Sequence, residues 1–155
     1  MDKNFYITTP IYYPSARPHM GHAYSSIIAD FFSRFKTIDG YKVCFLTGTD
    51  EHGLKIQRSA EKEGLDPLKF CDQISKTFRD LSKTLNLTNT DFIRTTEYRH
   101  KKTVQHLWKE LEKNDDIYLS NYSGWYSVSD EAFYNEDEIE EIDGKKISIS
   151  SKSNV

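Results

Sequence analysis

The sequence predicts an α/β protein whose first part is built on a parallel sheet. Two runs rich in β-branched and aromatic residues, 5–9 and 41–47, enclose a segment whose apolar residues recur three and four positions apart. Strand, helix and strand in this order make a βαβ unit, which implies parallel strands and a right-handed crossover. After residue 114 the chain changes to short strand-like runs between turn residues, which predicts a small antiparallel unit.

The composition is typical of a globular protein with one domain and the beginning of a second. The chain has 155 residues and a net charge of −3, which argues against a general nucleic-acid-coating protein. Cys44 and Cys71 are far apart and form no C-x-x-C pair, so we expect two buried free thiols. The sequence has no membrane-spanning run and no signal-peptide pattern, so we expect a soluble cytoplasmic protein without a membrane partner.

The first βαβ unit determines where ligands are expected. Its first strand, about 5–9, is continuously apolar or β-branched, as in a strand covered on both faces. Its helix, about 21–36, is expected to turn one apolar face to the core, formed by Ala23, Ile27, Ile28, Phe31, Phe32 and Phe35. Asp39-Gly40 is a turn signal before the second strand. In open α/β sheets ligands bind beyond the carboxyl ends of the strands.

The remaining elements follow from caps and periodicity. A helix over 54–63 is expected to stop at Gly64, and Asp66-Pro67 predicts the cap and first residue of the next helix. A third strand is expected over 91–96, followed by a helix over 98–113 with an apolar face. Strand-like runs follow at 117–119 and 124–128, and Ala132-Phe133-Tyr134 precedes an acidic run. Asp143-Gly144 is a strong hairpin-turn signal, with 146–149 as the return strand.

The loop after the first strand brings His19-Met20-Gly21-His22 to the start of a helix. Unpaired backbone N–H groups and the positive end of the helix dipole attract phosphate there, and two imidazoles add donors. Gly21 lets a flat ring approach the backbone. The pattern favours nucleotide phosphate binding, while two helix-start histidines without a ligand, or a metal site, stay open as alternatives.

A second polar cluster, Asp50-Glu51-His52, follows the second strand between Gly48 and Gly53. Carboxylates at a strand end can bind a substrate ammonium or act in acid–base chemistry. The alternative is a solvated loop in which Asp50 caps the next helix. Tyr12 and Tyr13 in the first loop are candidates for the wall of an apolar pocket, or for ordinary packing of the loop on the sheet.

Three blocks together resemble the methionyl-tRNA synthetases, which are class I aminoacyl-tRNA synthetases. These are Phe5–Pro14, His19–Tyr24 and Phe45–Gly53, and the resemblance covers essentially the whole chain as the amino-terminal part of such an enzyme. It implies a Rossmann-type, HUP-like catalytic domain that is split by an inserted connective domain. On this basis 1–115 would be the first half of the catalytic domain, and 116–155 the truncated beginning of the knuckle-like insertion.

The resemblance also implies roles for individual residues. His19, Gly21 and His22 match the family's HIGH motif, which binds ATP, and Met20 stands where Ile or Leu is usual. Ile11 and Tyr13 match positions that line the methionine pocket, and Asp50 matches the carboxylate that pairs with the methionine ammonium. Gly48, His52 and Gly53 support that block. The rest of the HIGH region is Tyr12, Pro14, Ser15, Ala16, Arg17 and Pro18.

The implied function is ATP-dependent activation of L-methionine, with Mg²⁺, and its transfer to tRNA(Met). Two departures matter. Ser127 and Asp130 stand where relatives carry zinc-binding cysteines, so no zinc is expected. The resemblance places the family's KMSKS loop beyond Val155, so the chain by itself is expected to have little or no activity. The alternatives are a non-catalytic remnant that binds ATP and methionine weakly, another class I synthetase, and an H-x-G-H nucleotidyltransferase.

Overall fold

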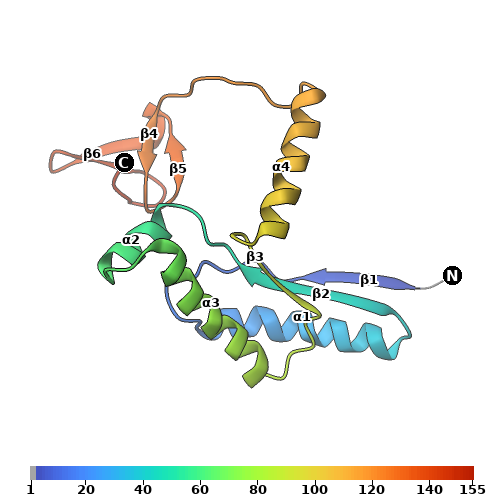
Figure 1. Ribbon diagram of the computed structural model, residues 1–155. Coiled ribbons are helices and arrows are strands. Elements are labelled where there is room, and N and C mark those ends of the chain that lie inside the picture. Colours follow the sequence, from blue (N-terminus) through green and yellow to red (C-terminus); the bar gives the residue numbers. More distant parts are fainter. Residues whose placement is uncertain (1–2) are drawn as a thin grey trace. The chain divides into compact units, whose positions relative to one another are not determined.

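The computed structural model describes residues 3–155 and confirms the α/β fold class with small antiparallel pairs after it (Figure 1). The chain divides into two compact units, one up to Lys109 and one from Glu110 to Val155. In chain order the elements are β1 (Asn4–Thr8), α1 (Met20–Ile38), β2 (Lys42–Thr49), α2 (Leu54–Lys62), α3 (Pro67–Thr84), β3 (Asp91–Arg94), α4 (Tyr98–Lys113), β4 (Trp125–Ser127), β5 (Ala132–Tyr134), the 3₁₀ turn η1 (Glu136–Glu138), β6 (Ile139–Ile142) and β7 (Lys145–Ser148).

The first unit is organised on a three-stranded parallel sheet in the order β1-β2-β3. Thr8 pairs with Leu46, and Thr49 pairs with Arg94, so β2 and β3 end at the same edge of the sheet. Beyond β1 the chain continues alongside β2, where Tyr12 makes an isolated parallel bridge to Thr49. The sheet therefore places the loop after β1 beside the residues that follow β2.

Helix α3 begins as the sequence predicts. The Asp66 carboxylate accepts hydrogen bonds from the backbone N–H groups of Leu68 and Lys69 at 3.0 and 3.2 Å, and Pro67 is the first helical residue. Strand β3 is two residues shorter than predicted. Its pairing with β2 continues as a single bond from the Thr95 N–H to the Thr49 carbonyl before the chain turns into α4.

The predicted core face of α1 is wrong except for Ala23. The helix packs on β1 and β2 through a face of small and polar residues. The large apolar side chains, Ile27, Ile28, Phe31, Phe32 and Phe35, are each 42–63% exposed. Apolar periodicity tells which side of a helix is apolar, but the packing partner decides which side is covered. The buried residues of α1 are Ala23, Ser26, Ala29, Asp30 and Ser33.

Asp30 explains why a polar residue lies on the covered side of α1. Its carboxylate accepts hydrogen bonds from the N–H and hydroxyl of Thr88, both at 2.6 Å, and pairs with Arg34 at 2.6 Å. Burial opposes ionisation of Asp30, but the bonds from Arg34 and Thr88 outweigh burial and keep its pKa below the ordinary value. The carboxylate therefore joins α1 to the segment that enters β3.

The exposed apolar side of α1 leads to a test on the 155-residue chain. We expect the chain to bind the dye ANS and to self-associate, because the exposed rings of Phe31 and Phe35 lie one helical turn apart. Replacing both by serine should reduce ANS fluorescence several-fold and favour the monomer in analytical ultracentrifugation. Tyr118→Ser is the matched control, since Tyr118 is 86% exposed but far from α1 in sequence. Equal ANS binding by all variants would contradict this prediction.

Strand β1 is covered on one face, not on both. Tyr6 is 62% exposed, whereas Phe5 is partly buried and lies 5.8 Å below the Lys36 ammonium of α1. Cys44 of β2 is exposed, so the expectation of a buried thiol is wrong there, while Cys71 of α3 is buried as expected. Both differences have one cause, because α1 covers a single face of this part of the sheet.

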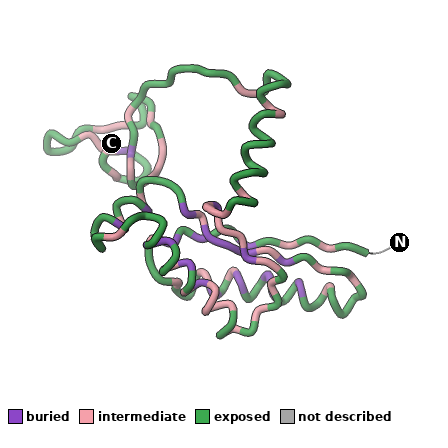
Figure 2. The backbone as a smooth tube through the Cα atoms, in the orientation of Figure 1, coloured by how far each residue is buried: buried purple, intermediate pink, exposed green. Residues whose placement is uncertain are grey.

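The core of the first unit lies near the carboxyl ends of the strands (Figure 2). Helices α2 and α3 bury one cluster between them, formed by Ile56, Ala60, Phe70 and Cys71. Tyr12, Phe78 and Phe92 form a second cluster, and Ile74 of α3 packs against both. Burial and the nearby Glu51 carboxylate raise the pKa of Cys71 to about 11, so this thiol stays protonated at neutral pH.

The second unit contains two antiparallel pairs, β4–β5 and β6–β7. The predicted hairpin turn is confirmed: Asp143 and Gly144 both have positive φ, 52° and 72°, as a type I′ turn requires. The strand predicted over 117–119 is wrong, since this segment is irregular and Leu119 is fully exposed.

No residue of α4 is fully buried, and its predicted apolar face is largely exposed at Val104, Leu107 and Trp108.

Candidate functional site

The loop after β1 is attached to the end of β2 by its backbone. The Tyr12 N–H donates to the Gly48 carbonyl at 3.0 Å, and the Asp50 N–H donates to the Tyr12 carbonyl at 2.9 Å. This strand-like pairing makes successive side chains alternate. Tyr12 is 8% exposed, whereas Ile11 and Tyr13 on either side of it are 41% and 42% exposed. The two exposed side chains therefore flank the backbone that holds Asp50.

Tyr12 connects this loop to the start of α1. Its ring stacks on Phe78 with centroids 5.6 Å apart, and its hydroxyl lies 3.0 Å from the Ser26 hydroxyl. The same ring meets the His22 imidazole edge to face at 4.8 Å. Tyr12 therefore packs the loop against α1 and α3, while Tyr13 stays exposed.

His19 and His22 form a reciprocal cap at the start of α1. The Gly21 N–H donates to Nδ1 of His19 at 3.0 Å, and the His19 N–H donates to Nδ1 of His22 at 3.0 Å. A nitrogen that accepts a hydrogen bond carries no proton, so each neutral ring holds its proton on Nε2. The cap therefore makes both imidazoles Nε2–H donors at the positive end of the helix dipole.

The two rings lie close together, with centroids 3.9 Å apart, and His22 also packs on Phe78 at 5.1 Å. Partial burial, and to a lesser extent the neighbouring His19, lower the pKa of His22. Because the folded pKa lies below the ordinary value of 6.5, His22 contributes stability that is present above that pH and is lost as the pH falls through the lowered value. His22 is thus neutral at pH 7.

Gly21 leaves room for the cap. A Cβ at this position would lie 2.9 Å from Cε1 and 3.1 Å from Nδ1 of His19. The ring that approaches the backbone is therefore that of His19. Met20, between the two, is 82% exposed. Of the rest of the HIGH region, Pro14 is buried, Ser15 and Pro18 are partly buried, and Ala16 and Arg17 are exposed.

The Asp50 block follows β2 directly. Asp50 is partly buried, Glu51 is buried and His52 is exposed. Asp50 does not cap α2, whose N-cap is Gly53 with a φ of 102°, a conformation that favours glycine. Gly48, two residues earlier, is in such close contact with β3 that a Cβ would lie 2.0 Å from the Ile93 carbonyl oxygen. The backbone conformation at Gly53 and the close contact at Gly48 therefore each explain why glycine stands there.

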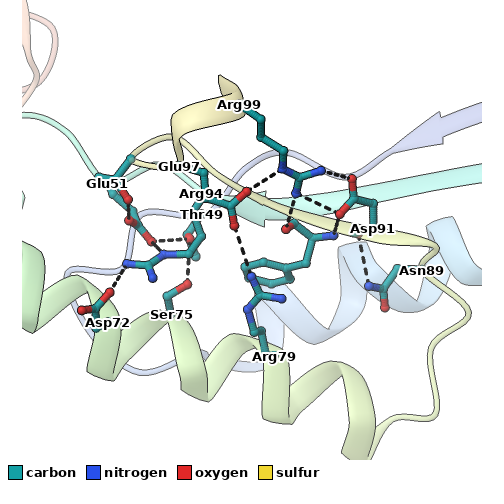
Figure 3. Close-up of polar contacts among 12 residues, drawn as sticks. Thr49, Glu51, Asp72, Ser75, Arg79, Asn89, Asp91, Arg94, Glu97 and Arg99 are labelled. Carbon is teal, nitrogen blue, oxygen red and sulfur yellow. Dashed lines mark hydrogen bonds and ion pairs between the residues drawn. The ribbon is translucent and has the colours of Figure 1, made fainter. Parts of the chain in front are cut away.

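Glu51 is the buried anchor of this block (Figure 3). Its side chain is fully buried, and Oε1 accepts hydrogen bonds from Arg94 Nε at 2.6 Å and from the Thr49 hydroxyl at 2.8 Å. Thr96 donates to Oε2. Burial opposes ionisation, but the bonds from Arg94, Thr96 and Thr49 outweigh burial and hold the pKa of Glu51 below its ordinary value.

Arg94 and Ser75 connect this network to α3. The Arg94 Nη2 atom lies 2.6 Å from the Asp72 carboxylate, and the Ser75 hydroxyl lies 2.9 Å from the Thr49 hydroxyl (Figure 3). The hydrogen bonds that Arg94 donates to the Glu51 and Asp72 carboxylates raise its pKa further above the ordinary value, so the guanidinium is always charged. The network therefore holds the ends of β2 and β3 together on α3, which fixes the backbone on both sides of Asp50.

The second unit contains a separate polar cluster around Asp130. Its carboxylate accepts hydrogen bonds from the hydroxyls of Tyr134 at 2.9 Å, Ser153 at 2.8 Å and Ser151 at 2.5 Å. The bonds from Ser151 and Ser153 lower the pKa of Asp130 to about 2. Asp130 N–H donates to the buried Ser127 hydroxyl, and Ser151 N–H makes the matching bond to buried Ser148.

The side chains of this cluster do not fit zinc, whose protein ligands are thiolates, imidazoles and carboxylates. One carboxylate and several hydroxyls bond to one another instead, and the residues that the structure describes contain no group of three or more potential metal-ligating side chains. The absence of zinc stays a prediction. The sequence pointed to Ser127 and Asp130 but not to Ser148 and Ser151. The available signal was the spacing, since Ser127 and Asp130 are three positions apart and so are Ser148 and Ser151.

Sequence reasoning also missed the residues that support Asp50 from outside its own block, namely Arg94, Thr95 and Thr96. They follow one another at the end of β3, so the rule that parallel strands end at a common edge was the available signal. Among the residues from 3 to 155, no helix is long and apolar enough to cross a membrane.

Comparison with known proteins shows the family of this chain. The model of the family described as tRNA synthetases class I (M) matches residues 5–146. The mitochondrial methionine–tRNA ligase of Takifugu rubripes is 49% identical over 155 residues, which cover 98% of this chain and 26% of the relative. The Listeria monocytogenes methionine–tRNA ligase is 51% identical over 142 residues, covering 91% of this chain and 21% of that protein.

The fold agrees equally well. The crystal structure of Mycobacterium tuberculosis methionyl-tRNA synthetase bound by methionyl-adenylate superimposes with a TM-score of 0.93 at 43% identity, over 98% of this chain and 30% of that one. The chain spans about a quarter of the length of the relatives it matches. The family match covers most of the chain and selects methionine over other class I types. The chain therefore belongs to the methionyl-tRNA synthetase family of class I aminoacyl-tRNA synthetases.

Proposed function

We propose that this chain supplies the HIGH-motif half of a site in which L-methionine is activated by ATP. The observation that carries the proposal is the backbone pairing of Tyr12 with Gly48 and Asp50. It holds the loop that leads to the capping histidines beside the strand end that bears a carboxylate. Donors for phosphate, exposed side chains for an apolar substrate and an anion for an ammonium group thus come from adjoining segments.

In this proposal His19 and His22 bind the phosphates of ATP through their Nε2–H groups. The methionine carboxylate attacks the α-phosphate, pyrophosphate leaves, and negative charge accumulates on the oxygens of the pentavalent phosphorus. Two oriented N–H donors at a helix N-terminus stabilise that charge without having to reorganise. Because burial lowers the pKa of His22, this donor is a neutral imidazole at pH 7. Mg²⁺ would accompany the phosphates.

Asp50 is proposed to pair with the methionine ammonium, and Ile11 and Tyr13 to contact the side chain. Their exposed fractions of 41% and 42% leave area for a thioether side chain to cover. The methionyl group would then pass to the terminal ribose of tRNA(Met), with AMP as the leaving group. Residues 1–115 would belong to the catalytic domain, and 116–155 to the inserted connective domain. The remaining parts of the site, including the lysine-rich loop, would come from residues outside this chain.

Isothermal titration of the 155-residue chain with L-methionine tests the proposal. We expect weak saturable binding of methionine and none of L-leucine. Asp50→Asn should weaken methionine affinity at least about tenfold, because a charge-assisted hydrogen bond contributes about 1.5–3 kcal/mol. His22→Ala should weaken ATP affinity and leave methionine binding unchanged. Asp39→Asn is the control, an exposed aspartate at the other end of α1. Equal heats for methionine and leucine would contradict the assignment.

A further inference from the structure

One buried hydroxyl contacts all three polar residues of the Asp50 block. Thr95, directly after β3, is 5% exposed. Its Oγ1 lies 2.8 Å from the Glu51 N–H nitrogen, 3.0 Å from Nδ1 of His52 and 3.5 Å from Oδ1 of Asp50. The Thr95 backbone is held separately, by its own N–H bond to the Thr49 carbonyl. The hydroxyl is thus placed by the sheet and bonded to the block.

The number of protons determines how these three bonds are arranged. A hydroxyl has one proton to donate and two lone pairs that accept. The Glu51 N–H occupies one lone pair. Asp50, when ionised, can only accept, so satisfying it requires the hydroxyl proton. When the hydroxyl proton goes to Asp50, the remaining lone pair accepts from His52, and the His52 proton is then on Nδ1 with Nε2 as an acceptor.

We propose that Thr95 is a positioning residue that orients the Asp50 carboxylate through the relay His52 Nδ1–H to Thr95 O–H to Asp50. This inference rests on the proposed function, in which Asp50 binds the methionine ammonium. An oriented carboxylate loses less side-chain freedom when the ammonium binds, which increases affinity. The relay also gives His52 a role, because its ring holds the hydroxyl in the orientation that donates to Asp50.

The tautomer of His52 can be used to detect its hydrogen bond to Thr95. His52 is exposed and, with Thr95, lines a cavity of about 290 Å³ on the side of α4. Water does not by itself hold an exposed imidazole in one tautomer, so a pure Nδ1–H form would report the bond to the Thr95 hydroxyl. His19 and His22 provide the opposite reference in the same chain, since their Nδ1 atoms accept backbone N–H bonds.

The experiment is a long-range ¹⁵N–¹H correlation spectrum of the histidine rings in the ¹⁵N-labelled chain, at alkaline pH where imidazole is neutral. We expect His52 to be protonated on Nδ1, and His19 and His22 on Nε2. Thr95→Val, which keeps the shape and removes the hydroxyl, should convert His52 to a mixture of tautomers and weaken methionine binding about tenfold. Thr95→Ser should restore both the His52 tautomer and the affinity.

Thr96→Val is the matched control, because the neighbouring hydroxyl donates to Glu51 and is outside the relay. It should lower stability but leave the His52 tautomer unchanged. A wild-type His52 protonated on Nε2 would overturn the proposal. So would a Thr95→Val chain that binds methionine normally while Asp50→Asn does not. If neither variant changes methionine affinity but the tautomers are as expected, the proposed function fails and the relay stands.

Discussion

Replacing Arg94 by methionine is expected to lower the free energy of unfolding by about 3–5 kcal/mol, because it leaves the Glu51 carboxylate buried without its cationic partner. The Glu51 side chain is fully buried and that of Arg94 is 19% exposed, so solvent screens the pair little. Urea unfolding followed by circular dichroism measures the loss. The double variant Glu51→Gln with Arg94→Met should recover part of it, since no unpaired charge remains.

Arg99→Met is the matched control for this prediction. Arg99 pairs with Asp91 and Glu97, but its side chain is 50% exposed, so solvent screens these ion pairs and we expect a much smaller loss than for Arg94→Met. Figure 3 shows the two arginines with their carboxylate partners. Similar losses for the two variants would contradict the view that burial, and not the number of ion pairs, makes Arg94 important.

The pH dependence of stability should follow the same pair. The folded pKa of Glu51 lies below its ordinary value of 4.5, so the stabilisation is fully present above pH 4.5 and is lost as the pH falls through the lowered value. In Arg94→Met, burial without the guanidinium should raise the pKa of Glu51. The stability difference between the wild type and Arg94→Met should therefore become smaller in acid.

Replacing Gly48 by alanine is the second change with a large expected effect. The new Cβ would lie 2.0 Å from the Ile93 carbonyl oxygen and 2.7 Å from its Cγ2 atom, and backbone cannot give way as the end of a flexible side chain can. We expect a loss of about 3 kcal/mol or more, because β2 and β3 must separate. Hydrogen exchange of the paired amides in these strands should accelerate, which locates the damage.

Gly124→Ala is the control, since its Cβ would have its nearest contacts at an ordinary 3.4 Å. We expect a change within about 0.5 kcal/mol. If Gly48→Ala is as stable as the wild type, the close contact between β2 and β3 is not as described. Because Thr95 and Asp50 both depend on this contact, Gly48→Ala should also weaken methionine binding.

The sequence predicted the elements whose signals are local. Asp66-Pro67 marks the start of α3 through a side-chain cap and a fixed φ, and Asp143-Gly144 marks a hairpin because both residues adopt positive φ. The order of strand, helix and strand predicted the parallel sheet and therefore the common edge at which Asp50 lies. The short runs of the second unit were harder, and Leu119 shows that an apolar triplet without a pairing partner forms no strand.

The sequence by itself determined the fold class, the position of the two histidines at a helix start and the position of Asp50 at a strand end, because each depends on residues adjacent in the chain. The tertiary structure decided what these residues contact. It turned the Ala23, Ser26 and Asp30 side of α1 to the sheet, made His19 and His22 cap one another, and brought Arg94 and Thr95 to the Asp50 block. These contacts depend on the distances between strands and on which groups can form hydrogen bonds and ion pairs with one another. A local sequence pattern does not specify either of these.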